Sequence, residues 1–444
     1  MSYAEKHHLI APEQFGSRKR HAPIDQVLIK TLFYDVLRMK RQDGYLCSND
    51  AKACYDRITH SIASLALQRV GLPIAPINCM LTSLQHMQHY IRTGYGLSAS
   101  SYGGFSNSGT PPQGSGQGNG ASPCIWVMVS TPLLQMMRAD NLGAHFISPL
   151  SKEKIFFVGC SFVDDTDLLC SSFNSSDTLD DITPQMQTAI NTWQGGLRAT
   201  GGALVPEKSW VYPIKYGWNH KGDYHLEPLE DLNIQFTVKD STQTIKPLQL
   251  VSPTDAKETL GVFLAPNGSH TAQIEYLRDK VTTWSDKVRT NHITSQNALL
   301  SMHTTILSSL KYPAPALSLT RKDWKYITAP LYKTGLQASG ICNKLPTVIR
   351  HGATSHLGLN LPCMYLTQGI QKLIKYIHSI STPTILGQML RLSEETLKLE
   401  LGLSGNLYSL PYSSTHFLAT NSWIKSYGSS HTNTTSKYKI TLHL

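Results

Sequence analysis

The sequence has little charge and lacks the common signatures of metal sites, export and membrane insertion. Only 16% of its 444 residues are charged, yet 41% are apolar, which is enough for sizeable cores and too many for a mainly disordered chain. The eight cysteines include no CxxC pair and the eighteen histidines no HExxH motif, so neither disulfide staples nor a zinc site is predicted. The first residues lack the apolar core of a signal peptide, so we do not expect secretion. The longest apolar stretch, residues 124–137, contains Ser130, Thr131 and Pro132, and we therefore expect no membrane partner.

Positive charge and length are what the chain does have. Lys and Arg number 40 against 30 Asp and Glu, which gives a formal net charge of +10. This balance favours polyanions as partners. At about 150 residues per domain, the length corresponds to roughly three domains.

The hydrophobic periodicity predicts helices mixed with strands up to about residue 215 and helices after residue 270. Helices are predicted over residues 24–42, 60–70, 77–90, 124–138, 183–200, 271–310, 364–380 and 385–400. Strands are predicted over residues 45–51, 154–163, 167–170, 207–214 and 258–264. A Gly-rich loop separates the third helix from the fourth, over residues 94–123.

Acidic residues that are far apart in the sequence stand at the ends of predicted strands. Asp50 ends the first strand, and Asp164 and Asp165 lie at the tip of a hairpin. Taken alone, an Asp-Asp pair is most often an ordinary polar turn. These two, however, interrupt almost wholly apolar strands, where unpaired charges are costly without a cation. Carboxylates on adjacent strand ends would suit two Mg²⁺ ions that support phosphoryl transfer.

Several short segments carry a family resemblance. DAKACYD occupies residues 50–56, QGNGASP residues 117–123 and FVDD residues 162–165. In this order they resemble the DAxxAFD, QGxxxSP and FVDD or FADD motifs of the reverse transcriptases of non-LTR, LINE-type retrotransposons. Less specific matches lie in EQFGSRKRHAPIDQ, GGALVPEKSW and TLGVFL, so that the resemblance covers roughly residues 12–300.

The resemblance implies an α+β fold of the right-hand polymerase type, with an antiparallel palm sheet, packed helices, partial fingers and a helical thumb. The implied division begins with partial fingers in residues 1–44 and a palm in residues 45–215. A connecting hairpin and palm-thumb junction follow in residues 216–270, and a thumb-like region in residues 271–400. Residues 401–444 are expected to be a poorly ordered tail.

The same resemblance implies roles for the acids and their neighbours. Asp50, Asp164 and Asp165 would be the catalytic, metal-binding residues, with two Mg²⁺ ions or Mn²⁺ as a substitute. Ala51 and Tyr55 would contact the incoming nucleotide. An aromatic ring at Tyr55 would collide with a 2′-hydroxyl and so favour dNTPs over rNTPs; the alternative is a tyrosine that only fills the core.

Further substrate contacts are implied in the loops. Gln117 and Gly118 would let backbone amides approach the template and the incoming base; alternatively the loop is a flexible connector, and Gln113 is a rival for this role. Lys208 resembles a palm lysine that protonates the leaving pyrophosphate, although a solvated surface lysine is equally plausible.

A basic cluster formed by Arg18, Lys19 and Arg20 would contact nucleic-acid phosphates. The alternative is an exposed turn without a ligand, at near even odds.

The implied function is RNA-directed DNA synthesis on an RNA template from a DNA primer with dNTPs, in an intracellular, nuclear or cytoplasmic ribonucleoprotein. An Arg-Pro-Ile fingers segment that precedes the EQFGSR-like stretch in the family is not in the sequence, so we expect an N-terminally truncated copy. A catalytically inactive or repurposed nucleic-acid-binding remnant is therefore the alternative. An RNA-dependent RNA polymerase is disfavoured by Tyr55 and by the lack of Gly before the Asp pair.

Overall fold

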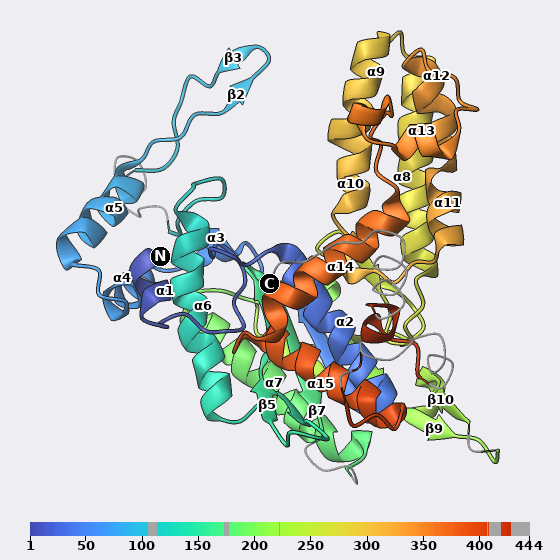
Figure 1. Cartoon of the computed structure of the whole chain (residues 1–444). Helices are drawn as coiled ribbons and strands as arrows, with labels where there is room; N and C mark the ends of the chain where they lie inside the picture. The colour runs from blue at the N-terminus through green and yellow to red at the C-terminus, as the bar shows by residue number, and fades with distance from the viewer. Residues whose placement is uncertain (105–112, 173–176, 222, 406, 408–418, 428–444) are drawn as a thin grey trace.

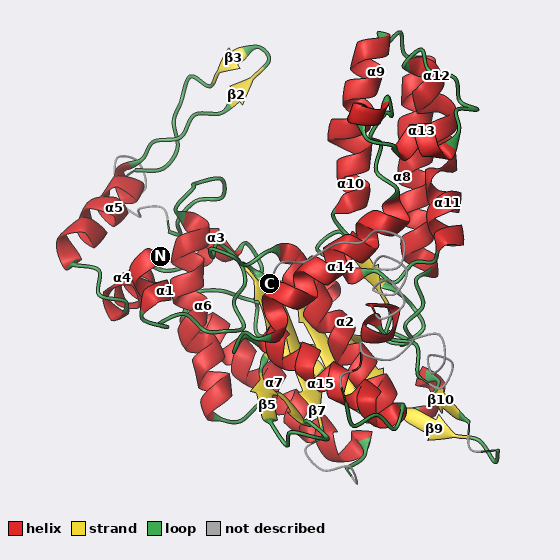
Figure 2. Cartoon of the chain, in the orientation of Figure 1, coloured by secondary structure: helices red, strands yellow, loops and turns green. Residues whose placement is uncertain are grey.

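The computed structural model describes residues 1–104, 113–172, 177–221, 223–405, 407 and 419–427. In this part of the chain a small sheet is surrounded by helices (Figure 1). An arm with α5, β2 and β3 and a helical region with α8 to α13 extend from it in different directions. Figure 2 shows most strands in the body below the arm and the helical region, and β2 and β3 near the tip of the arm. The mixed α/β class with a largely antiparallel sheet is confirmed. No helix of the described residues is both long and apolar enough to cross a bilayer.

The first half of the chain supplies the body and the arm. Its elements as far as the arm are α1 (Ser2–Lys6), α2 (Pro23–Lys40), β1 (Gly44–Asn49), α3 (Cys54–Arg57), α4 (His60–Arg69), α5 (Ile74–His86), β2 (Arg92–Thr93) and β3 (Gly96–Leu97). They are followed by α6 (Ser122–Ala139), β4 (Ala144–Ile147), β5 (Lys154–Phe157), β6 (Gly159–Phe162), β7 (Asp165–Ser171), α7 (Leu179–Ala199) and β8 (Trp210–Ile214).

The second half consists of short hairpins and then helices. The strands are β9 (Tyr216–Trp218), β10 (Tyr224–Leu226), β11 (Thr237–Lys239), β12 (Ile245–Pro247), β13 (Gln249–Leu250), β14 (Lys257–Thr259) and β15 (Val262–Leu264). The helices are α8 (Thr271–Thr290), α9 (Ser295–Ser301), α10 (Leu307–Lys311), α11 (Arg321–Pro330), α12 (Leu336–Ala338), α13 (Thr347–His351), α14 (Met364–Ile380) and α15 (Ile385–Glu400).

The central sheet has the strand order β13-β8-β1-β7-β6, with β13 parallel to β8 and the other neighbours antiparallel. Its two faces are covered by two separate hydrophobic cores, because alternate side chains of a strand point to opposite faces. Leu46 and Leu169 belong to the core that contains α2. Tyr45 and Cys47 belong to the core that contains Trp126 of α6. The sheet is therefore an internal layer, which explains why its strands are so apolar.

Helix α2 is buried along almost its whole length. It begins at Pro23, where Asp25 accepts a hydrogen bond from the Ala22 amide (3.0 Å), and proline fits the first turn of a helix. Behind the sheet, the Lys30 ammonium of α2 lies 2.9 Å from the Asp167 carboxylate of β7, and both side chains are at most 5% exposed. The Lys30 ammonium also donates to the Thr259 hydroxyl (2.7 Å). This buried ion pair joins the helix to the strand.

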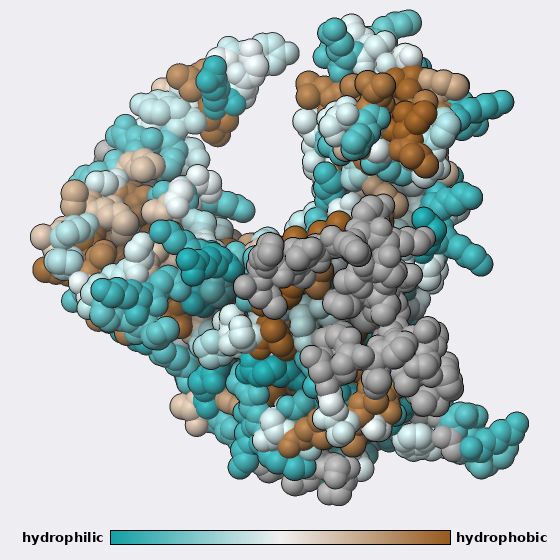
Figure 3. Space-filling view, viewed as in Figure 1, coloured by the Kyte–Doolittle hydropathy of each residue, from teal (hydrophilic) through white to brown (hydrophobic). Residues whose placement is uncertain are grey.

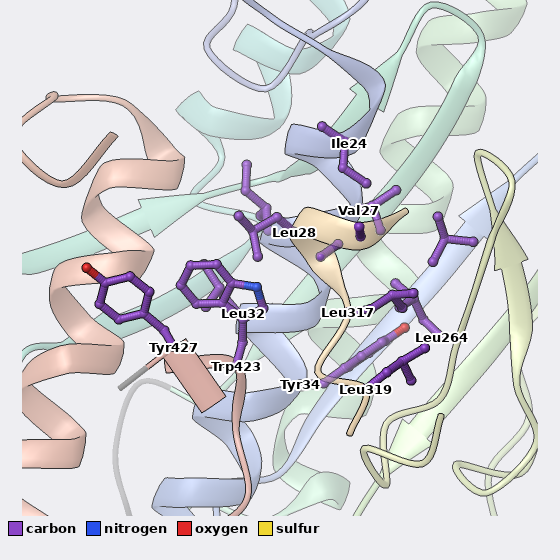
Figure 4. Packing of buried hydrophobic residues seen from close by; sticks show 14 of the residues in the cluster. Ile24, Val27, Leu28, Leu32, Tyr34, Leu264, Leu317, Leu319, Trp423 and Tyr427 are labelled. Atoms are coloured by element: carbon purple, nitrogen blue, oxygen red, sulfur yellow. The ribbon is translucent and has the colours of Figure 1, made fainter. Parts of the chain in front are cut away.

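The segment from residue 419 to 427 packs against α2 from the other end of the chain. Figure 4 shows Trp423 beside Leu32 and Leu28, with Tyr427 next to it. The rings of Trp423 and Tyr427 are stacked with centroids 5.9 Å apart. The Trp423 amide donates to the Asp35 carboxylate (2.6 Å). The predicted tail of residues 401–444 lies partly outside the described residues, and its described part is packed in this way.

Four elements differ from the pattern predicted by periodicity. The strand expected over 207–214 begins with a 3-10 helix, Pro206–Lys208, and only Trp210–Ile214 forms β8. The strand expected over 154–163 is two strands, because β5 pairs with β4 and β6 pairs with β7, and Gly159 comes so close to β7 that a Cβ there would lie 2.0 Å from the Asp167 carbonyl oxygen. The strand expected over 258–264 is the hairpin β14–β15, which turns at Leu260 and Gly261 with positive φ at both residues. The helix expected over 271–310 ends first at Thr290, before Asn291 in an extended conformation.

Replacing Lys30 by methionine is expected to destabilise the protein by about 3–5 kcal/mol, because the Asp167 charge would remain buried without its cation. Urea unfolding followed by tryptophan fluorescence measures this loss. The double variant Lys30→Met/Asp167→Asn is expected to recover more than half of it, since it removes both charges. Equal stability of the wild type and Lys30→Met would contradict the role assigned to the pair.

Candidate active site

Sequence segments that resemble separate motifs meet at one end of the central sheet. The last registered pair between β1 and β7 is Asn49 with Thr166, so Asp50 and Asp165 are the next residues on two adjacent strands. Asp164 directly precedes Asp165, in the turn that joins β6 to β7. The structure therefore brings together the three acids that the sequence predicts to act together.

The tip of this hairpin has an unusual backbone. Val163 has φ of 58°, which lies in the left-handed region that β-branched residues rarely adopt. The turn begins at this residue, and Asp165 already forms part of β7, so the predicted loop of Asp164, Asp165 and Thr166 is shorter than expected. A strained residue next to an acid pair requires surrounding contacts that hold it in place.

The Gln14 side chain supplies those contacts. Its oxygen accepts a hydrogen bond from the Val163 amide (3.0 Å), and its nitrogen lies 3.2 Å from the Val163 carbonyl oxygen. The same amide group bonds the Ser130 and Ser161 hydroxyls, both at 3.1 Å. Trp126 also donates from its indole nitrogen to the Val163 carbonyl. Gln14 is fully buried, so this primary amide fixes both backbone groups of the strained residue.

The segment around Gln14 lies along the outer edge of β6. The Phe15 amide donates to the Ser161 carbonyl (2.7 Å), and the Ser161 amide donates to the Glu13 carbonyl (2.8 Å). At Gly16 a Cβ would lie 2.4 Å from the side chain and 2.5 Å from the amide nitrogen of Val163. Only glycine leaves room for the hairpin tip at this position.

The acids at the hairpin repel one another. The pKa of Asp165 is raised from its ordinary value of 3.8 to about 6, first because the surrounding chain displaces water and then because of the negative charges of Asp164, Asp167 and Asp50. Its side chain is nevertheless open to solvent. Asp167 has Lys30 as its own cation, whereas Asp50, Asp164 and Asp165 stand at the end of the sheet. This end therefore attracts cations.

Asp50 is held against the segment that contains Lys208. The Asp50 amide donates to the Ser209 hydroxyl (3.2 Å), and the Asp50 carbonyl accepts from the Val205 amide (3.0 Å). The next residue, Ala51, forms an isolated β-bridge with Leu204. As a result the Lys208 ammonium lies 3.8 Å from the Asp50 carboxylate, with 70% of the Lys208 side chain exposed.

Tyr55 lies on the short helix α3 and is half-buried. Its phenol pKa is raised, first by burial and then by the negative charge of Asp164. Burial, followed by the charge of Asp164, also raises the pKa of the Cys54 thiol. The sugar-contacting position expected at Tyr55 is therefore beside the carboxylates.

The Gly-rich loop packs against the backbone of α3. The Ser115 amide donates to the Tyr55 carbonyl (2.8 Å), and the Gln117 amide donates to the Asp56 carboxylate (3.0 Å). Gly114 has φ of 82°, and a Cβ there would lie 2.4 Å from the Tyr55 carbonyl oxygen. The side chains of Gln117 and of its rival Gln113 are exposed, as is Gly118. Residues 105–112 of the loop lie outside the described residues.

The three basic residues near the N-terminus separate into two groups. The Arg18 guanidinium binds both oxygens of the Glu5 carboxylate (2.8 and 2.9 Å) and donates to the carbonyls of Ala11 and Gln14. These contacts give Arg18 a structural role. They occupy the guanidinium that was expected to contact nucleic-acid phosphates. Lys19 and Arg20 are exposed.

The donor set at the hairpin consists of carboxylates, which are the ligands that Mg²⁺ prefers in proteins. Burial raises the pKa of Asp165 most, and the negative charges of Asp164, Asp167 and Asp50 raise it further. In the conformation described here, however, no group of three or more His, Cys, Asp or Glu residues among the described ones converges closely enough to hold a metal ion. The chemistry of the residues fits a divalent cation.

Reasoning from the sequence missed Gln14 and Gly16. Both lie in EQFGSRKR, where a role is predicted only for the basic residues. The available signal is the presence of a glutamine and a glycine in a segment rich in basic residues. Both residue types are suited to close backbone contact.

No family model matches the chain and no curated protein is similar to it. Solved structures that it resembles are telomerase from Candida albicans in complex with a TWJ fragment of telomeric RNA (11% identity, TM-score 0.37), the same kind of complex from Candida tropicalis (13%, 0.32) and apo telomerase from Candida tropicalis (13%, 0.31). These matches cover 95%, 85% and 86% of this chain, which spans 57%, 53% and 56% of the respective telomerase chains. TM-scores below 0.5 carry no argument about function.

Replacing Gln14 by leucine is expected to lower the free energy of unfolding by about 2–4 kcal/mol, because the backbone groups of Val163 would lose buried hydrogen bonds. Chemical denaturation measures the change. Gln68→Leu is the matched control, because Gln68 is exposed and bonds only Ser64 on its own helix (3.0 Å). Equal, small effects of the two substitutions would show that Gln14 does not hold the hairpin.

Proposed function

We propose that the chain is an RNA-directed DNA polymerase of the LINE retrotransposon type, which adds dNTPs to a primer 3′-hydroxyl. The observation that carries this proposal is the position of Asp50 and Asp165 as neighbours on β1 and β7, directly after the last registered pair. Each of these strand ends belongs to a segment that resembles a reverse-transcriptase motif.

The surroundings of the acids support the same assignment. In the QGNGASP segment the Gln117 backbone amide donates to the Asp56 carboxylate of α3, and Lys208 lies 3.8 Å from Asp50. The resemblance to reverse-transcriptase motifs predicts that these segments lie near one another in the fold, although more than a hundred residues separate some of them in the sequence. Chance similarity of short motifs does not account for such an arrangement.

In the proposed reaction the primer 3′-oxygen forms a bond to the α-phosphorus of the dNTP, and the bond from this phosphorus to pyrophosphate breaks. Bound Mg²⁺ would supply charge stabilisation for the attacking and leaving oxygens. Asp50, Asp164 and Asp165 would hold it through their carboxylates. Lys208 would donate a proton to the leaving pyrophosphate, and Tyr55 would limit the space at the sugar 2′-position.

A catalytically inactive nucleic-acid-binding remnant is the second candidate. It is favoured by one observation, the lack of three converging metal ligands among the described residues. Under this hypothesis the positively charged chain would retain a primed RNA template without extending the primer.

Asp164→Asn is expected to reduce primer extension on an RNA template by at least about a thousandfold in Mg²⁺, because it removes a carboxylate charge where transition-state charge must be balanced. Extension products on a denaturing gel measure the rate. The matched control is Asp140→Asn, an exposed residue after the end of α6, which is expected to leave extension unchanged. Template binding without extension by the wild type would favour the remnant, and extension by Asp164→Asn at the wild-type rate would reject the assigned acid.

Tyr55→Val is expected to increase incorporation of ribonucleotides relative to deoxyribonucleotides by about tenfold or more, because a smaller side chain leaves room for a 2′-hydroxyl. Competing rNTP and dNTP incorporation opposite the same template base measures the ratio. Tyr3→Val changes an exposed tyrosine on α1 and serves as the control. An unchanged ratio would show that another residue selects the sugar.

A further inference from the structure

The helical region contains a pocket with an unusual charge. It has a volume of about 690 Å³ and lies between α11, α13 and the start of α14. Five Lys and Arg side chains line it, and none of its lining residues is Asp or Glu. We call it the cationic pocket, and its five cationic members are Arg321, Lys325, Lys333, Lys344 and Arg350.

The sequence around this pocket is free of acids over a long stretch. No Asp or Glu occurs between Asp323 and Glu394, whereas Lys and Arg occur there repeatedly. Among the described residues, no member of the cationic pocket takes part in an ion pair. Like charges gathered in this way repel one another and destabilise the folded chain unless an anion is bound.

Arg350 is placed for an anion rather than for solvent. Its guanidinium carbon lies 4.6 Å from the centroid of the Tyr332 ring, and one terminal nitrogen donates to the Leu345 carbonyl (3.2 Å). The Nε atom is buried and has no hydrogen-bond partner among the described residues. Because Nε is enclosed, a phosphate would meet the terminal nitrogens of this fixed guanidinium, whose planar fork suits phosphate oxygens.

The cations at the rim of the pocket are long, exposed side chains that can follow a chain of phosphates. Arg321 and Lys325 lie one turn apart on α11 and are exposed, as are Lys333 and Lys344. Tyr365 and His351 also line the pocket. Cations that track a backbone, combined with rings on which bases stack, are typical of single-strand binding. A pocket of this volume is on the scale of a small molecule, so a rigid duplex would reach only the rim.

The pocket lies apart from the candidate active site. In Figure 1, α9 and α10 form the side of the helical region toward the arm, and α11 and α13 lie on the opposite side. Figure 3 shows the wide opening between the arm and the helical region, and hydrophilic side chains that project from the far edge of that region. A strand bound at the cationic pocket would therefore run outside this opening.

We propose that the cationic pocket is a second nucleic-acid site, which binds the phosphate backbone of single-stranded RNA on the outer side of the helical region. It goes beyond the proposed polymerase activity and does not depend on it, because the contacts involve none of the acids at the hairpin. In the protein such a site would hold a strand that is not engaged at Asp50.

The test uses the full chain and a fluorescein-labelled 20-nucleotide RNA of unstructured sequence, in EDTA and without dNTPs. Lys325→Ala/Lys333→Ala/Lys344→Ala is compared with Lys152→Ala/Lys154→Ala/Lys221→Ala, which removes the same charge from exposed lysines elsewhere. Fluorescence anisotropy is expected to show binding weakened about tenfold or more at 100 mM KCl for the first variant, and less than about twofold for the control. The slope of log K against log salt should decrease by about 2 in the first variant, since each phosphate contact on a single strand contributes about 0.7.

Two further measurements locate the strand. RNA that carries 4-thiouridine is expected to cross-link to peptides within residues 321–365 after irradiation, and a blunt 20-base-pair RNA–DNA duplex is expected to lose less than about threefold in affinity in the pocket variant. Equal losses for the two triple variants, cross-links confined to residues 1–210, or an equal loss for the duplex would each overturn the proposal. Because neither metal nor dNTP is present, failure of the polymerase hypothesis leaves this result unaffected.

Discussion

The antiparallel pairing of β1 with β7 is the constraint on which the rest of the molecule depends. It runs from Gly44 with Ser171 to Asn49 with Thr166, and both faces of these strands are buried in different cores. A slip of one residue would send every side chain to the wrong face. Hydrophobic packing therefore fixes the register, and the register determines that Asp50 emerges beside Asp165.

The acids on and near β7 are treated in two different ways by the fold. Asp167 lies inside the protein and is neutralised by Lys30 at 2.9 Å. Asp164 and Asp165 stand three and two residues earlier at a tip where Val163 has a rarely adopted backbone conformation. Gln14 holds that backbone by hydrogen bonds without adding charge. The protein thus balances the charge that it buries and keeps the charge at the tip available for a ligand.

Much of this arrangement could be predicted from local sequence, because it follows from periodicity and strand ends. The helices over 364–380 and 385–400 coincide with α14 and α15, whose apolar residues repeat with helical spacing. The meeting of Asp50 with the Asp pair follows from apolar strands that end in acids. By contrast, the bond between Arg18 and Glu5 and the contacts of Gln14 depend on which segments pack together. Buried polar residues carry no periodic signal, so their partners are determined by the folded chain alone.

The contact between α2 and the segment near residue 423 has a consequence for synthesis of the protein. Arg38 of α2 donates to the Asn421 carbonyl (2.7 Å), and Asp35 accepts from the Trp423 amide. Arg38 and Asp35 can pair with each other within the helix, but their partners near residue 423 are made only after almost four hundred more residues. During that interval the nascent chain must shelter this surface, and a ribosome that stalls before residue 419 would leave it uncovered for chaperones or proteases.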